Sequence, residues 1–155
     1  MQEALFLTSE SRLRAADAVA AILVDPQGRY IVQRRDDKPT IFFPGHWGCF
    51  GGAVDAGEEP ADALQRELRE ELELALDAAQ LKYFTRIDFD FAPLGGAQVF
   101  RIYYEIRIAP AQVAALRLHE GQAVRHADGR ELLLRERVTP YDAFAIWMHL
   151  RACTP

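Results

Sequence analysis

Three glutamates near the middle of the chain have a spacing that could bind a divalent metal ion. Glu67, Glu70 and Glu71 stand at positions i, i+3 and i+4, so on a helix turning by about 100° per residue they lie along one edge. Carboxylates this close repel each other, at a cost of roughly 0.2–0.5 kcal/mol per pair. A hard cation such as Mg²⁺ or Mn²⁺ prefers oxygen ligands and turns that repulsion into coordination. The alternative is a charged helix face exposed to solvent, which an acidic helix taken alone would favour.

The residues around these acids predict a helix from Pro60 to about Ala75. Proline at the first helical position and Asp62 in the first turn are typical of a helix start. One apolar stripe follows the helical period and consists of Ala61, Leu64, Leu68, Leu72 and Ala75. It lies roughly 110° around the helix from the acids, so the leucines can be buried while the carboxylates stay along an edge. The preceding Gly51 and Gly52 allow backbone groups to approach a ligand closely.

The stretch from Gly52 to Leu74 resembles the signature of the Nudix hydrolases. That signature is Gly, five residues, Glu, seven residues, then Arg-Glu-aliphatic-x-Glu-Glu-x-Gly-aliphatic. At that spacing the chain supplies Gly52, Glu58, Arg66, Glu67, Leu68, Glu70, Glu71 and Leu74. The single departure is Glu73, which stands where the family has the glycine that ends the helix. This departure puts the end of the helix in question more than the metal site.

The resemblance implies a role for each matching residue. Glu67, Glu70 and Glu71 would bind one to three Mg²⁺ ions, with Mn²⁺ as an alternative, and the Gly51 carbonyl would be a further ligand. Arg66 would orient a carboxylate by ion pairing, and Glu58 would support that arrangement. The segment Glu120-Gly121-Gln122 looks like a loop of the mutator-type nucleoside triphosphate hydrolases in which the glutamate binds metal. Glu120 is therefore a candidate metal ligand, and an exposed loop acid is the equally weighted alternative.

The reaction implied is attack by a metal-activated water on a phosphorus of a diphosphate. A carboxylate would take the proton from that water, and Glu67, Glu70 and Glu120 all stay open as the base. Arg34 and Arg35 could contact phosphates, although an exposed position would explain at least one of them. Four aromatic side chains could stack on a base, although each is more often a packing residue: Trp47, Phe91, Tyr104 and Trp147. We take Trp47 and Gly52 as substrate-binding candidates.

The rest of the sequence predicts an α/β fold of the Nudix type, an α/β/α sandwich with a mixed sheet packed between helices, in one domain over residues 1–155. Residues 18–24 and 30–33 flank a Pro-Gln-Gly turn and indicate a β-hairpin. Strands are expected at about 81–91 and 98–108, and a short one at 123–126. Residues 41–52 suggest a strand entering a tight turn, and 140–151 indicate an amphipathic helix.

Composition and charge narrow the class of protein. The net charge is −5 and no basic block appears, so the electrostatic pattern of a nucleic-acid-binding protein is missing. No apolar run approaches the roughly 20 residues that span a membrane, and no signal peptide is apparent. Cys49 and Cys153 are far apart and show no metal-ligand spacing, which fits reduced thiols in a cytoplasmic protein. We expect a small nucleotide-like partner, no nucleic acid and no membrane, and we include a homodimer among the oligomeric states open to the chain.

The sequence therefore favours a Mg²⁺-dependent hydrolase of the diphosphate linkage in a nucleoside diphosphate derivative, such as a nucleoside triphosphate or a nucleotide sugar. One alternative is a non-catalytic Nudix-fold module that binds a nucleotide or a protein. Such modules usually lose the acids of the signature, and all three helix acids are kept here. The other is an isoprenoid diphosphate isomerase, which needs further cysteine and glutamate groups; only Cys49 lies near the signature.

Overall fold

The computed structural model of the protein describes residues 15–153. Within these residues the strands form one seven-stranded mixed sheet, with the path β3-β2-β1-β6-β5 joined by β4 against β1 and by β7 against β2. The strands are β1 (Ala18–Val24), β2 (Tyr30–Arg34), β3 (Trp47–Gly48), β4 (Phe50–Ala53), β5 (Lys82–Asp90), β6 (Gln98–Arg107) and β7 (Ala123–Ala127). The helices are α1 (Pro60–Leu72), α2 (Pro110–Ala115), α3 (Gly129–Arg135) and α4 (Pro140–Cys153), with 3₁₀ turns η1 (Ala78–Gln80) and η2 (Ala92–Leu94).

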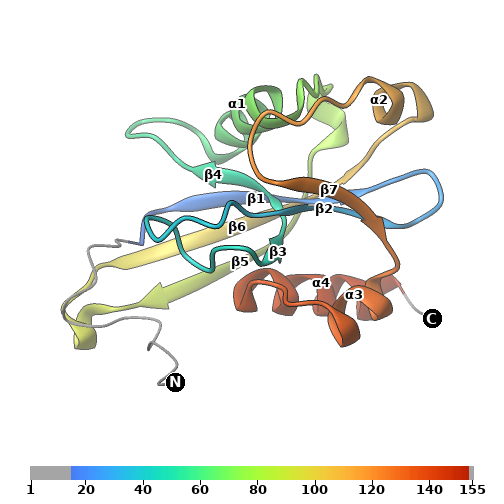
Figure 1. Ribbon diagram of the computed structural model, residues 1–155. Coiled ribbons are helices and arrows are strands. Elements are labelled where there is room, and N and C mark those ends of the chain that lie inside the picture. Colours follow the sequence, from blue (N-terminus) through green and yellow to red (C-terminus); the bar gives the residue numbers. More distant parts are fainter. Residues whose placement is uncertain (1–14, 154–155) are drawn as a thin grey trace.

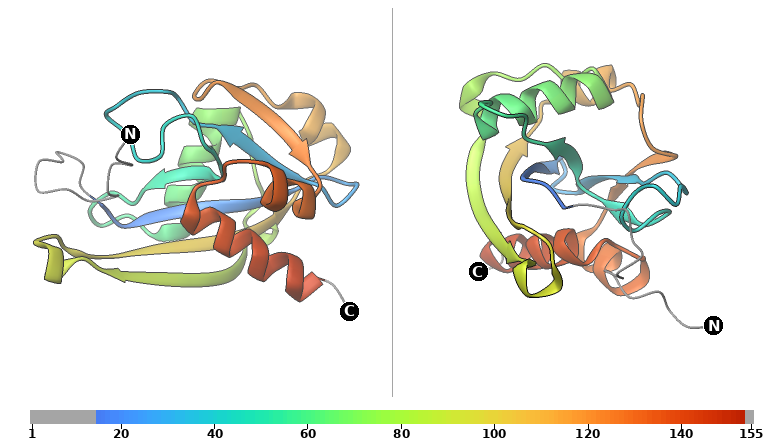
Figure 2. Two further views of the ribbon diagram at one scale, coloured as in Figure 1. Left: turned by 60° about the horizontal axis from the view of Figure 1, so that its bottom comes forward. Right: turned by 90° about the vertical axis from the view of Figure 1, so that its left-hand side faces the viewer.

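The helices cover both faces of the sheet, as predicted for an α/β/α sandwich. Helices α1 and α2 lie on one side, and α3 and α4 lie on the other (Figures 1 and 2). Each face has its own hydrophobic cluster: Leu64, Leu68 and Leu72 of α1 belong to one, and Leu132 and Ile146 belong to the other. Strand β1 contributes to both clusters, which explains why its sequence is apolar at nearly every position.

Strand β1 is central and changes its partner along its length. It pairs with β6 in parallel over all seven residues. On its other side it meets β2 at Val24 and Tyr30, near the hairpin turn, and pairs with β4 from Ala18 to Ala21. Strand β2 therefore leaves β1 after the turn and pairs with β3 and β7 instead. The candidate site is built in the region where β2 and β4 diverge.

Helix α1 begins at Pro60 as predicted but ends at Leu72, three residues before the predicted end. Glu73 adopts the left-handed conformation, with φ 55° and ψ 24°. Its N–H donates to the Arg69 carbonyl at 3.0 Å, and the Leu74 N–H donates to the Leu68 carbonyl at 3.2 Å. The bond from the left-handed Glu73 to the carbonyl four residues earlier is that of the αL capping motif, in which the left-handed residue is usually glycine. The helix therefore stops at the position that the Nudix signature gives to glycine.

The buried stripe of α1 differs slightly from the predicted one. Leu64, Leu68 and Leu72 are buried as predicted, and Ala63 is buried where Ala61 was expected. Ala75 lies beyond the end of the helix and is exposed. The predicted helix was almost one turn too long, because the prediction continued it past the left-handed Glu73.

The predicted hairpin, the strands on both sides of η2, the short strand at 123–127 and the C-terminal helix are confirmed within one to two residues. Two short helices were not predicted. Helix α2 has six residues and begins at Pro110, and α3 has seven residues and is capped by the Asp128 carboxylate. Residues 41–46 contain no strand, and the extended backbone begins at Trp47. Helices this short show too few turns for a periodic pattern. Among residues 15–153, no helix has the length and apolar character that crossing a membrane would require.

Candidate functional site

Arg66 organises the side chains at the start of the acidic edge of α1. Its guanidinium donates to both oxygens of Glu58, at 2.9 and 3.0 Å, and to Oε1 of Glu67 at 2.7 Å. A further hydrogen bond of 3.1 Å reaches the Ala53 carbonyl at the end of β4. The bidentate contact with Arg66 holds the pKa of Glu58 below its usual value. Arg66 thus fixes Glu67 in place through one of its carboxylate oxygens and ties α1 to β4.

Glu71 lies one helical turn after Glu67 and is almost fully buried, with 4% of its surface exposed. Its Oε2 accepts the backbone N–H of Gly51 at 3.0 Å. Burial, together with the nearby carboxylates of Glu120 and Glu67, raises the pKa of the Glu71 carboxyl to about 8, against the hydrogen bond from Gly51. A carboxylate in this environment favours either a proton or a cation beside it.

Glu120 is brought to this edge by the loop that precedes β7. The N–H of His119 donates to the Glu71 carbonyl at 2.8 Å, and the N–H of Gln122 donates to the Arg34 carbonyl at 2.8 Å. Gly121 lies between them with φ 87°, and a Cβ there would stand 2.9 Å from the Arg34 carbonyl oxygen. A side chain is therefore excluded at residue 121 both by conformation and by space. These contacts hold Glu120 near enough to raise the pKa of Glu67 and of Glu71, although burial is the larger cause for both.

Glu67, Glu71 and Glu120 line a cavity of about 450 Å³, a size typical of sites for small organic ligands. Gly51 and Gly52 form part of its wall, and a Cβ at Gly52 would stand 2.5 Å from Cδ of Glu67. The backbone of β4 therefore approaches the carboxylate more closely than any residue with a side chain would permit. The remaining wall is contributed by Ala15, Ala16, Ala18, Gln33, Arg35, Asp36, Lys38, Ile41, Phe42, Ala53, Phe89, Phe91, Val99, Phe100, Arg101, Gly121 and Tyr141.

The wall contributed by β5, β6 and Phe91, the residue before η2, is rich in aromatic side chains. The rings of Phe89 and Phe91 are parallel to within 5°, with centroids 5.8 Å apart. Phe42 enters from the loop between β2 and β3. Cationic groups accompany these rings, because Arg35, Lys38 and Arg101 also line the cavity. The cavity therefore combines an acidic wall with apolar surface and positive charge.

Asp142 of α4 fixes Arg101 in the cavity wall. Its Oδ1 accepts from Arg101 at 3.1 Å and from the Tyr103 hydroxyl at 2.8 Å. Its Oδ2 accepts from the Thr139 hydroxyl at 2.8 Å and from the Cys49 N–H at 2.9 Å. The Arg101 guanidinium also lies 4.7 Å from the centre of the Tyr141 ring. The start of α4 is thereby joined to β6 and to the β3–β4 segment.

The structure brings together some of the predicted site residues and separates others. The cavity is lined by Glu67, Glu71, Glu120, Gly51, Gly52 and Arg35, and Arg66 and Glu58 lie beside Glu67. Glu70 does not line the cavity, because its side chain is 62% exposed and lies 3.6 Å from Arg66. Arg34 is exposed and directs Nε to the Gly45 carbonyl at 3.4 Å. The Trp47 ring lies 6.0 Å from the Arg125 guanidinium, and Trp47 is likewise outside the cavity wall.

Of the four aromatic side chains considered for base stacking, Phe91 alone lines the cavity in the part of the chain that the structure describes. Cys49 is buried and does not line the cavity, so the structure gives no support to an isomerase site that uses this thiol. Sequence reasoning missed Gln33, Lys38, Phe89, Arg101 and Tyr141. Each of these comes from a strand, a loop or a helix start outside the signature, so its position in the cavity depends on the folded topology.

A comparison of the sequence with models of protein families identifies the family of this chain. The model of the NUDIX domain matches residues 14–132 of the chain, which is most of its length and includes the acids of α1 and Glu120. The chain belongs to the Nudix family. The signature at 52–74 and the Nudix-like fold therefore agree with an independent match over a much longer stretch.

Two curated Nudix relatives share sequence with part of the chain. An RNA pyrophosphohydrolase of Gluconacetobacter diazotrophicus is 46% identical over 57 residues, which are 35% of this chain and 34% of that protein. The nucleoside triphosphatase NudI of Escherichia fergusonii is 44% identical over 50 residues, or 32% of this chain and 35% of that protein. The matches thus span about a third of the length of these relatives.

A solved structure agrees over nearly the whole chain. The MutT protein from Methanosarcina mazei Go1 superimposes with a TM-score of 0.74, covering 94% of this chain and 99% of the other, at 18% sequence identity. At this identity the likeness shows the fold alone. It confirms the predicted Nudix architecture, with a mixed sheet between helices.

Proposed function

We propose that this protein is a Mg²⁺-dependent hydrolase that cleaves the diphosphate linkage of a nucleoside diphosphate derivative. The observation that carries the proposal is the meeting of Glu67 and Glu71 from α1 with Glu120 from a distant loop at one wall of a cavity of about 450 Å³. Surface acids on a solvated helix would have no reason to converge on a cavity. Burial of Glu71 adds to this, because a bound cation would stabilise the ionised form of a buried carboxyl beside two others.

The donor set fits a hard divalent cation. Carboxylate oxygens of Glu67, Glu71 and Glu120 would hold Mg²⁺, with Mn²⁺ as an alternative, and the Gly51 carbonyl is a candidate for a further ligand. Glu70 lies on the same edge, and its exposed side chain has the freedom to turn toward the ion. The absence of side chains at Gly51 and Gly52 supports this assignment, since backbone lies close to Glu67 there. When bound, the ion would lower the pKa of a water ligand and offset phosphate charge.

The side chains of the protein divide the remaining tasks. Arg66 keeps Glu67 in a fixed orientation through a 2.7 Å hydrogen bond, and Glu58 keeps Arg66 in place. Glu71 is restrained by the Gly51 N–H. Among the described residues, none donates a comparable hydrogen bond to the carboxylate of Glu120, and Glu120 is exposed to solvent. We therefore assign Glu120 as the group that takes the proton from the attacking water.

The other walls of the cavity suggest the class of substrate. Arg35, Lys38 and Arg101 provide positive charge for the phosphates beyond the cleaved bond, and Phe89 and Phe91 provide apolar surface for a planar base. One of the two curated relatives is named as an RNA pyrophosphohydrolase and the other as a nucleoside triphosphatase. We therefore propose nucleoside triphosphates and related nucleotide diphosphate compounds as the substrate class.

A substrate screen tests this proposal. Purified protein with Mg²⁺ is incubated with nucleoside triphosphates, nucleotide sugars, dinucleoside polyphosphates, ADP-ribose and 5′-triphosphorylated RNA, and the products are separated by chromatography. We expect cleavage within the diphosphate of at least one class, and loss of that cleavage in Glu71→Gln. The matched control is Asp62→Asn, which changes an exposed acid on the same helix. Binding of these compounds with no cleavage would instead support a non-catalytic module.

A further inference from the structure

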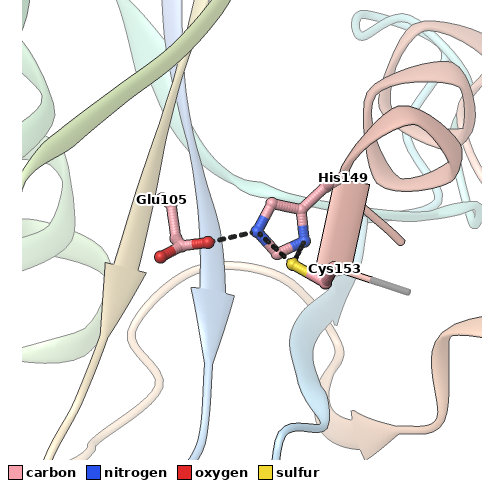
Figure 3. A group of neighbouring side chains, drawn as sticks. All are labelled: Glu105, His149 and Cys153. Atoms are coloured by element: carbon pink, nitrogen blue, oxygen red, sulfur yellow. Dashed lines mark hydrogen bonds and ion pairs between the residues drawn. The ribbon is translucent and has the colours of Figure 1, made fainter. Parts of the chain in front are cut away.

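A second cluster of metal-binding side chains lies at the opposite end of α4 from Tyr141 and the cavity. Glu105 of β6 meets His149 and Cys153, which stand one helical turn apart on α4 (Figure 3). None of the three lines the cavity. We assigned no metal-ligand spacing to Cys153 from the sequence, because the helix alone supplies only two ligands and Glu105 is distant along the chain.

The distances in this cluster are close to those around a tetrahedral ion. The three donor atoms lie within 4.8 Å of one another. Bonds of about 2.0–2.3 Å to a tetrahedral ion would separate carboxylate, imidazole and thiolate donor atoms by about 3.3–3.6 Å. Sγ of Cys153 is 3.8 Å from Nε2 of His149, and Oε2 of Glu105 is 2.5 Å from the same nitrogen. An ion would thus enter between His149 and Glu105 if the carboxylate moved back by less than about 1 Å.

The side chain of Cys153 is free to rotate toward the position of the ion. Its Sγ is nearly equidistant from the two ring nitrogens, at 3.8 and 4.0 Å, so it lies beside the ring and not along the lone pair of Nε2. Cys153 is exposed on the last turn of α4. Rotation of its side chain toward Nε2 therefore displaces no packed group.

The surroundings of the cluster suit metal ligation. The Tyr30 hydroxyl lies 2.8 Å from Nδ1 of His149, and a proton on Nδ1 that bonds this oxygen would leave the lone pair of Nε2 for a metal. Arg107 donates to Glu105 at 3.0 Å and lies 4.0 Å from Sγ of Cys153. With Cys153 as a thiolate, the site has one thiolate, one carboxylate and one guanidinium. A divalent ion would therefore bind to a net charge of −1.

We propose that Glu105, His149 and Cys153 bind one divalent ion of the zinc type, at a site separate from the acidic cavity. Thiolate and imidazole ligands favour Zn²⁺ over Mg²⁺, whereas the all-oxygen set of the cavity favours Mg²⁺. Three protein ligands leave a fourth position for water or another small ligand. Binding replaces the thiol proton of Cys153, which passes to solvent. The ion would also cross-link the C-terminal turn of α4 to β6, through His149 and Cys153 on one side and Glu105 on the other.

Alkylation of Cys153 tests this site without reference to activity. Cys49 is buried, so iodoacetamide acting on the folded full-length protein reports on Cys153. We expect one equivalent of Zn²⁺ to slow alkylation of Cys153 at least about tenfold, and Mg²⁺ to leave the rate unchanged. Glu105→Gln should reduce the protection by Zn²⁺, while Glu131→Gln, which changes an exposed acid of α3, should retain it. An unchanged alkylation rate in the presence of Zn²⁺ would overturn the proposal.

Co²⁺ provides a second measurement, since a thiolate ligand gives a sulfur-to-cobalt charge-transfer band in the near ultraviolet. The band should appear in the wild type and in Glu71→Gln, and it should be absent in Cys153→Ser. Because Cys153 is exposed, its replacement by serine is not expected to disturb folding, and circular dichroism checks this. Cobalt absorption that survives in Cys153→Ser but disappears in Glu71→Gln would assign the ion to the acidic cavity and refute the second site.

Discussion

Glu71 combines burial, two neighbouring carboxylates and a single backbone N–H donor. The adjacent Glu70 belongs to the same acidic pattern and yet is mainly exposed. The helical period separates the two acids, because Glu71 lies close to the stripe of buried leucines and Glu70 lies further round the helix. The tertiary structure adds the Gly51 N–H of β4 on the Glu71 side. Two adjacent acids of one signature therefore occupy different environments, and their titration should differ accordingly.

The raised pKa of Glu71 predicts how the stability of the metal-free protein varies with pH. Burial raises this pKa from 4.5 to about 8, so between these values the unfolded carboxyl is ionised while the folded one keeps its proton. The contribution of Glu71 to the free energy of unfolding should thus be present below about pH 4.5 and be lost as the pH rises toward about 8. Glu71→Gln should remove this loss and be the more stable protein at pH 8, by at least several tenths of a kcal/mol.

Chemical denaturation in the presence of chelator, at a series of pH values, measures this difference. Asp62→Asn serves as the control and should follow the wild-type curve. If Glu71→Gln and wild type lose stability in parallel as the pH rises, Glu71 does not carry the raised pKa.

Glu120 gives a kinetic prediction at the same scale. If it takes the proton from water, Glu120→Gln should lower kcat by a factor on the order of 10² while KM changes little, because the loss belongs to the transition state. Steady-state kinetics on the substrate found in the screen measures both constants, with Asp62→Asn as the control. Wild-type kcat in Glu120→Gln would leave Glu67 or Glu70 as the base.

The sequence predicted the acids of α1 because the helical period and the fixed spacing of the signature are local properties. Glu120 was reached only through the resemblance of its loop, and the structure explains its position by hydrogen bonds from the loop backbone to the Glu71 and Arg34 carbonyls. Arg101 and Phe89 could not be predicted in the same way. Their side chains reach the cavity because β5 and β6 pair beside β1, and no local pattern encodes that pairing.

At the scale of the helix, Glu73 is a residue under strain. A side chain in the left-handed conformation costs about 1 kcal/mol or more relative to glycine. The hydrogen bond between Glu73 and His119, at 2.6 Å, joins two exposed side chains and so contributes little. Glu73→Gly should therefore raise the free energy of unfolding, by about 0.5–1 kcal/mol. Equilibrium denaturation of this variant, compared with Glu73→Ala, measures the effect. A destabilised glycine variant would mean that the contact with His119 outweighs the backbone strain.

The start of α4 depends on Asp142. Replacement by asparagine would leave the guanidinium of Arg101 without a buried anion, and such a loss typically costs about 3 kcal/mol or more. Asp142→Asn should lower stability by that amount, and it should also raise KM, because Arg101 and Tyr141 line the cavity. Thermal denaturation and kinetics below the melting temperature check both effects. A stable variant with normal KM would show that the network does not position the cavity wall.

For the elements, sequence prediction worked where the pattern was long. The hairpin, the two long strands and helices α1 and α4 were predicted because each has at least five residues of consistent period or β-propensity. Helix α3 was missed because its three leucines in a row follow neither period clearly. The end of α1 was placed too late because Leu72, Leu74 and Ala75 continue the apolar pattern past a turn that backbone conformation alone defines.

For the whole molecule, the two faces of the sheet have different roles. Helix α1 supplies the acids on one face, while α4 on the other face holds Arg101 and Tyr141 toward the cavity at one end and the cluster of Glu105, His149 and Cys153 at the other. Both sites include residues of β6, because Arg101 lines the cavity and Glu105 belongs to the second cluster. Together the two proposals give the protein a Mg²⁺ site made of oxygen ligands and a Zn²⁺ site that includes a thiolate and an imidazole.

The dependence of hydrolysis on metal tests the central proposal most directly. The protein is treated with excess chelator, assayed on the nucleotide substrate identified by the screen, and assayed again after Mg²⁺ or Mn²⁺ is restored. We expect cleavage of the diphosphate to stop in chelator and to return with the metal, because the acids of the cavity neither neutralise one another nor activate water without a cation. Undiminished cleavage in excess chelator would contradict the proposed function.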